Sequence, residues 1–87
     1  MVDDFLAQIR AAIEKRVREQ LARHLRVDPN ADVRKIIDIQ IRQERERLEG
    51  QALEYEDAGQ DRQAELVRML TEDWLPELAQ QLNRTFY

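Results

Sequence analysis

Apolar residues recur along the first 27 positions with the spacing of one helical face. The intervals of 3, 4, 4, 4 and 4 residues place these side chains on one stripe of an α-helix. A stripe of this extent corresponds to a helix about 33 Å long. Asp3 and Asp4 precede it and can cap the helix N-terminus. The pattern predicts a first long helix that ends at Val27 and whose stripe consists of Leu6, Ile9, Ile13, Val17, Leu21 and Leu25.

A second apolar stripe follows Asp28-Pro29, where aspartate can act as an N-cap and proline fits the first helical position. The stripe extends to Ala58-Gly59, and glycine is typical of a helix C-terminus. Gly50 lies inside this segment and is the position where we expect a bend, because glycine costs about 1 kcal/mol in a helix interior. Glu44 occupies the one step of the stripe that lacks an apolar residue. The stripe comprises Val33, Ile37, Ile41, Leu48, Ala52 and Tyr55.

The segment from Ile37 to Arg42 has a second interpretation, because it alternates apolar and polar residues as a half-buried strand does. A strand needs a pairing partner, and the sequence contains no second alternating segment. The residues from Arg42 to Glu49 are good helix formers with acids and bases on neighbouring turns. We therefore expect a helix here, with a strand as the alternative.

A third helix is predicted from Asp61, which can cap it, to the residue before Pro76. A short fourth helix or tail with Leu78 and Leu82 follows. The predicted fold class is all-α: a three-segment helical bundle of long helix, long helix with Gly50 as its candidate bend and third helix, with a short C-terminal helix or tail. Residues 1–87 form a single domain. The apolar positions of the third helix are Ala64, Val67, Leu70, Trp74 and Leu75.

The size of the chain suggests that it associates with another chain. A protein of 87 residues buries only about 60 to 68% of the surface that its unfolded form exposes. Two long amphipathic helices are difficult to cover with one short third helix, so we expect a homo-oligomer or a complex with a partner protein. The predicted interface consists of Leu6, Ile9, Ile13, Val17, Leu21, Ile37, Ile41 and Leu48.

Composition excludes several classes of protein. Hydrophobic residues make up 43% of the chain, which supports a folded core, and no apolar run approaches the roughly 18 residues of a transmembrane helix. Cysteine is absent, which excludes disulfides, thiolate zinc sites and iron–sulfur clusters. The acidic N-terminus is unlike a secretory signal. We therefore expect a cytoplasmic protein that is not associated with a membrane.

The sequence offers few residues for catalysis or metal binding. His24 is the only histidine and lies beside the first stripe, so a boundary position is favoured over a ligand or proton shuttle. Serine is absent, and no glycine-rich phosphate loop is found. One acidic cluster fits a solvated face better than a calcium loop or an acid–base pair. We expect no enzyme activity, cofactor or metal; the acidic cluster is Glu54, Glu56, Asp57 and Asp61.

The net charge of −4 conceals a gradient along the chain. Residues 1–27 carry a net charge of +2, residues 28–50 carry −1 and residues 51–87 carry −5. Five basic residues of the first helix fall within an arc of roughly 160° opposite the apolar stripe. A solvated, salt-bridged face is favoured, and the alternative is contact with the phosphates of tRNA or another RNA. These residues are Lys15, Arg16, Arg18, Arg23 and Arg26.

Residues 41–82 carry three motifs in a recognisable order, which are Arg42-Gln43-Glu44-Arg45, then Tyr55-Glu56-Asp57-Ala58-Gly59-Gln60-Asp61, then Trp74-Leu75-Pro76-Glu77. This order resembles the helical part of the GatB/YqeY family, which includes the tail of the B subunit of aspartyl/glutamyl-tRNA amidotransferase. Gln60 stands where that family usually has arginine. The resemblance implies an all-helical fold and tRNA contacts through Arg42, Arg45 and Arg47.

These observations favour a noncatalytic helical module for protein interaction or oligomerisation. One alternative is an accessory protein that contacts tRNA or RNA through the basic face of the first helix. A second alternative is an acidic inhibitor that mimics nucleic acid through residues 54–77.

Overall fold

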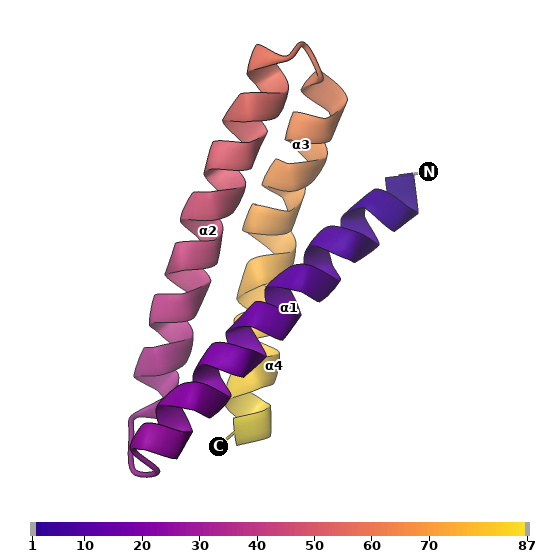
Figure 1. The fold of residues 1–87 in the computed structure, drawn as a ribbon. Helices are drawn as coiled ribbons and strands as arrows, with labels where there is room; N and C mark the ends of the chain where they lie inside the picture. The colour runs from indigo at the N-terminus through magenta and orange to yellow at the C-terminus, as the bar shows by residue number, and fades with distance from the viewer. Residues whose placement is uncertain (1, 87) are drawn as a thin grey trace.

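The computed structural model describes residues 2–86, and its long helices are joined by two short loops (Figure 1). The described residues contain no strand, so the all-α helical bundle predicted from the sequence is confirmed, and the segment from Ile37 to Arg42 is helical. No helix among the residues described here has the length and apolar character needed to cross a bilayer. The elements are α1 (Val2–Val27), α2 (Val33–Asp57), α3 (Asp61–Met69), a π-helical turn η1 (Leu70–Trp74) and α4 (Leu75–Phe86).

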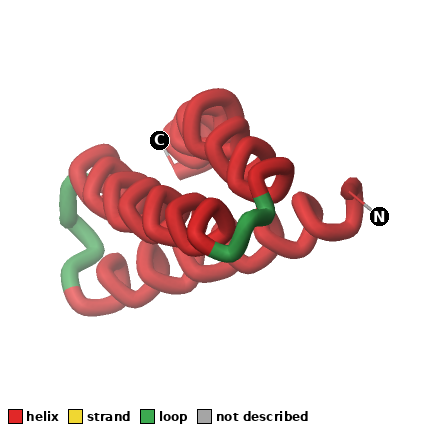
Figure 2. The backbone as a smooth tube through the Cα atoms, turned by 90° about the horizontal axis from the view of Figure 1, so that it is seen from above, coloured by secondary structure: helices red, strands yellow, loops and turns green. Residues whose placement is uncertain are grey.

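The helices form two layers. α2 lies antiparallel to the rod made by α3, η1 and α4, and α1 crosses one face of this pair diagonally (Figure 1). Figure 2 shows the same arrangement from above, with α1 running beneath the other helices. The molecule is elongated, with extents of 46, 21 and 17 Å along its principal axes. One face of the antiparallel pair is therefore covered by α1, and the other is not.

The core lies where the two layers meet. Three residues of α1, four of α2 and six of the α3–α4 rod are buried there, and the half-buried Phe5 and Tyr55 rings close one end with an edge-to-face contact of 5.8 Å between centroids. Hydrophobic burial of this kind is the main favourable term in folding. The core residues are Ile13, Val17, Leu21, Ile37, Ile41, Leu48, Ala52, Ala64, Val67, Leu70, Leu75, Leu78 and Leu82.

Both loops show how local chemistry sets the helix boundaries. The prediction that α2 begins at Asp28-Pro29 is wrong by about one turn, because the Asp28 carboxylate accepts a hydrogen bond of 3.0 Å from the Asn30 backbone N–H and so forms a turn. Asp32 is the actual N-cap, and its carboxylate accepts a bond of 3.2 Å from the Lys35 N–H.

α2 passes through Gly50 as a single unbroken helix and ends where the sequence predicts. Gly59 has a φ of +76°, and two backbone bonds complete the cap. The Gly59 N–H donates to the Glu56 carbonyl at 2.9 Å, and the Gln60 N–H donates to the Tyr55 carbonyl at 2.7 Å. This glycine-dependent turn reverses the chain direction and brings α3 antiparallel to α2.

The prediction that the third helix stops before Pro76 is also wrong, as is the assignment of Asp61 as its cap, since Asp61 is already helical. The chain continues through η1, in which the Leu75 N–H bonds to the Leu70 carbonyl with the longer reach of a π-helix. Proline is tolerated in the first turn of a helix, and the wider turn relieves the clash with the preceding carbonyl. The result is one continuous rod from Asp61 to Phe86.

Candidate interaction surfaces

Six of the eight residues predicted to form an intermolecular interface lie inside the core of a single chain. Each is at most 7% exposed, and the other two, Leu6 and Ile9, are half-buried against the same core. The prediction that these stripes need a second chain is therefore wrong. The prediction took the third segment to be too short to cover the two stripes. The continuous rod through Pro76 instead offers an apolar face nearly as long as α2. The six core residues are Ile13, Val17, Leu21, Ile37, Ile41 and Leu48.

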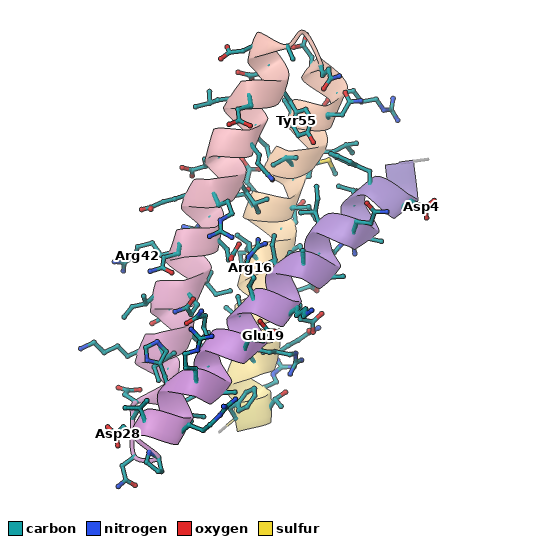
Figure 3. The ribbon with its side chains drawn as sticks, in the orientation of Figure 1. Asp4, Arg16, Glu19, Asp28, Arg42 and Tyr55 are labelled. Carbon is teal, nitrogen blue, oxygen red and sulfur yellow. The ribbon has the colours of Figure 1, made fainter. Side chains whose placement is uncertain are left out.

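Arg16 of the predicted basic face is directed toward α2, where it meets Glu44 (Figure 3). Its Nε donates to Glu44 Oε1 and its Nη2 donates to Glu44 Oε2, each at 2.9 Å, so the guanidinium and carboxylate form a bidentate pair. Arg47 adds an ion pair of 3.6 Å between its Nη1 and Glu44 Oε1. Glu44 is only 4% exposed, so this pair belongs to the packing between α1 and α2.

The chemistry of this pair explains the gap in the apolar stripe of α2. Glu44 takes the step between Ile41 and Leu48, and its charge is neutralised where it is buried. The hydrogen bond to Glu44 raises the pKa of the Arg16 guanidinium above its ordinary value, partial burial opposes this, and the Coulomb attraction of Glu44 adds to it. The charged residue within the stripe was the sequence signal for this contact.

The predicted basic face is thus smaller than its five residues suggest. Arg16 is engaged by Glu44, and Arg18 donates to the Glu14 carboxylate one turn earlier, with 3.1 Å between Nη2 and Oε1. The other three are exposed on α1 and make no ion pair among the residues that the structure describes. Glu19 lies among them (Figure 3). These three are Lys15, Arg23 and Arg26.

The other candidate residues of the sequence are dispersed on the surface. His24 is exposed, and Glu56 of the acidic cluster forms an ion pair with Arg68, which ties α2 to α3. Within residues 2–86 no three acidic or histidine side chains gather as a metal site would require. Glu54, Asp57 and Asp61 are exposed near the turn between α2 and α3.

An open groove lies between α2 and the α3–η1 segment, and none of the described α1 side chains lines it. Its volume is about 570 Å³, and Thr71 lies at its base, with the hydroxyl donating to the Val67 carbonyl at 3.1 Å. Leu53 stands on its α2 wall and is 57% exposed. Four charged side chains, two of each sign, complete the lining: Arg45, Glu49, Arg68 and Glu72.

A stripe of exposed residues runs along α2 beside this groove, and sequence analysis missed it. Its members follow one another at intervals of 3, 4, 3 and 4 residues, which is one face of a helix. Ile39 at one end is 41% exposed and Leu53 lies at the other. The signal was weak, because only two of its members are apolar. We call this set the outer stripe of α2; it consists of Ile39, Arg42, Glu46, Glu49 and Leu53.

Comparisons with known proteins give no relative from which a role can be carried over. No family model, no curated protein and no solved structure matches this chain. The resemblance of residues 41–82 to the GatB/YqeY family therefore stays a prediction. Function must be argued from the surfaces described above.

Proposed function

We propose that this chain is a noncatalytic helical module that acts by binding another protein chain through the face that α1 leaves uncovered. The observation that carries the proposal is Leu53, a large apolar side chain held 57% exposed on the wall of the groove. Ile39 extends the same apolar character along the outer stripe. Single exposed apolar residues are common, but two on one face beside a groove favour a docking surface.

The shape of the groove favours a protein over a small molecule. Small-molecule sites are enclosed, mostly apolar clefts with a few polar groups that fix the ligand. This groove is open, and four of its six lining residues are charged. A helix that lays an apolar edge against Leu53 and pairs its charges along both walls suits this geometry better.

The experiment compares Leu53→Glu with the control Met69→Glu. Met69 is also exposed, at 51%, but does not line the groove. We expect the Leu53 variant to lose the protein associations that the wild type makes, both with itself and with other proteins captured by crosslinking, while the Met69 variant keeps them and both variants keep the helical circular dichroism spectrum. The proposal fails if Leu53→Glu binds everything that the wild type binds.

Contact with RNA is a second candidate, favoured by one observation. Lys15, Arg23 and Arg26 lie exposed on α1 and are free of ion pairs among the described residues. The resemblance to the GatB/YqeY family adds support. Two features oppose it: Arg16 and Arg18 are engaged by acids, and Glu19 lies within the face.

A salt titration with tRNA tests this candidate, because phosphate contacts weaken steeply as salt rises. Arg23→Glu, which reverses one of the three exposed basic residues, should weaken retention at low salt. Arg62→Glu on α3 is the matched control, since Arg62 is exposed on a different element and makes no ion pair among the described residues. Equal retention of both variants would exclude the α1 face as an RNA contact.

A further inference from the structure

The charges of the outer stripe and of Arg45 beside it have an order that the proposed function does not use. Reading along α2, two exposed arginines come first and two exposed glutamates follow. The side chains of all four make no ion pair with any other residue that the structure describes, although acids and bases elsewhere on the helices do so. These four residues are Arg42, Arg45, Glu46 and Glu49.

This order is self-complementary about one point. Arg45 and Glu46 flank the midpoint, and Arg42 and Glu49 lie equally far from it on opposite sides. Ile39 and Leu53 also lie on opposite sides, at distances from the midpoint that differ by one residue. When a second copy of α2 runs in the opposite direction, each basic position along the sequence is therefore level with an acidic position of the other copy. Each apolar end is likewise level with the other apolar end.

Resting on the proposed function, we infer that the partner is a second copy of this chain, docked with the two α2 helices antiparallel about a two-fold axis between Arg45 and Glu46. In such a dimer each contact occurs twice, since the same surface is used by both copies. Arg42 meets Glu49 of the second copy, and Ile39 packs against Leu53. Arg45 and Glu46 lie about 100° apart around the helix, so they flank the axis on opposite sides.

The remaining surface of the molecule is consistent with this arrangement. The outer stripe lies on exposed positions with α1 already in place, so α1 need not move for a second chain to dock. The outer stripe extends about 21 Å along α2, from Ile39 to Leu53, so its contact is smaller than the roughly 800 Å² that each partner buries in a standard interface. The whole chain carries −4, so two copies repel at long range, and the facing arginines and glutamates offset this repulsion locally.

We expect a weak dimer, because exposed ion pairs contribute little and only two apolar pairs are available. Sedimentation equilibrium of the full chain up to about 1 mM should show an average mass that rises with concentration. Arg42→Glu places like charges at both symmetric contacts and should weaken the dimer roughly tenfold, and Glu49→Arg should do the same.

The decisive step is to mix these two variants. Positions 42 and 49 are both acidic in the first variant and both basic in the second, so each acid of one chain then faces a base of the other. The mixture should therefore associate about as tightly as the wild type, and so should the double variant Arg42→Glu/Glu49→Arg. Positions 42 and 49 of one helix are about 10 Å apart along its axis, so a salt bridge within one chain does not account for such a rescue.

A wild type that stays monomeric to about 1 mM overturns the inference, and so does a mixture that associates no better than the single variants. Failure here is distinct from failure of the proposed function. If the wild type is monomeric but binds a different protein in a manner that Leu53→Glu abolishes, the self-association inference is wrong and the proposed function stands. If Leu53→Glu also binds that protein unchanged, both fail.

Discussion

Arg16 of α1 and Glu44 of α2 are joined by two parallel hydrogen bonds of 2.9 Å across the contact between the two layers. Glu44 is buried, whereas the Arg16 side chain is 42% exposed and reaches inward from the edge of the contact. A buried carboxylate is costly without its cation. The pair therefore specifies how α1 lies across α2, in addition to the apolar contacts around it.

Removing one member of this pair should destabilise the protein more than replacing both members by apolar residues. Arg16→Met leaves the Glu44 carboxylate with only the longer contact to Arg47, and we expect the free energy of unfolding to fall by about 1 to 3 kcal/mol. The double variant Arg16→Met/Glu44→Leu removes both charges and should recover most of that loss. Urea unfolding measures both values.

Arg18→Met is the matched control for this experiment. Arg18 pairs with Glu14 on the exposed surface of the same helix, so its loss should change the free energy of unfolding by less than about 0.5 kcal/mol. Equal effects at Arg16 and Arg18 would contradict a structural role for Glu44.

Replacing each of the two glycines by alanine should change the free energy of unfolding in opposite directions. Gly50 lies inside α2, and a Cβ there meets no atom within 4 Å, so Gly50→Ala should stabilise the protein by about 0.5 to 1 kcal/mol. Gly59 has a φ of +76°, which strains any other residue, so Gly59→Ala should destabilise it by about 1 kcal/mol. Thermal unfolding of both variants checks the signs.

Shortening one apolar side chain of the α1 stripe tests whether that stripe is buried within a single chain. Leu21→Ala should lower the free energy of unfolding by about 2 to 5 kcal/mol, because it empties a fully buried position. The loss should be the same at low and high protein concentration, since the contacts lie within one chain. Leu53→Ala, on the exposed groove wall, should cost less than about 0.5 kcal/mol. A loss at Leu21 that depends on protein concentration would point instead to an intermolecular stripe.

The fold was predictable where periodicity and caps act locally. The stripe of Ile13, Val17 and Leu21 identified the buried face of α1, and Gly59 identified the end of α2. The start of α2 was not predictable, because Asp28 and Asp32 can each cap a helix. Which of them is the N-cap depends on which side chain forms the turn that precedes the helix. The continuation past Pro76 depends on the π-helical turn, which has no local sequence pattern.

The candidate site was less predictable than the fold. Glu44 interrupts the apolar stripe of α2 in the sequence, but its pairing with Arg16 and the exposure of Leu53 follow only from how the three segments pack. The error over which residues could form an interface had the same origin. Counting helices underestimated the apolar face that the α3–α4 rod supplies, and the proposed docking surface lies on a different side of α2 from the predicted interface.

Nuclear magnetic resonance on a dilution series locates the docking surface residue by residue, because backbone amide shifts report where a second chain touches. Concentration-dependent shift changes should concentrate on α2 between Ile39 and Leu53 and on the groove residues of α3 and η1, while Ile13, Val17 and Leu21 of α1 stay unchanged. Changes centred on these α1 residues, or none up to about 1 mM, would rule out a dimer that docks through α2.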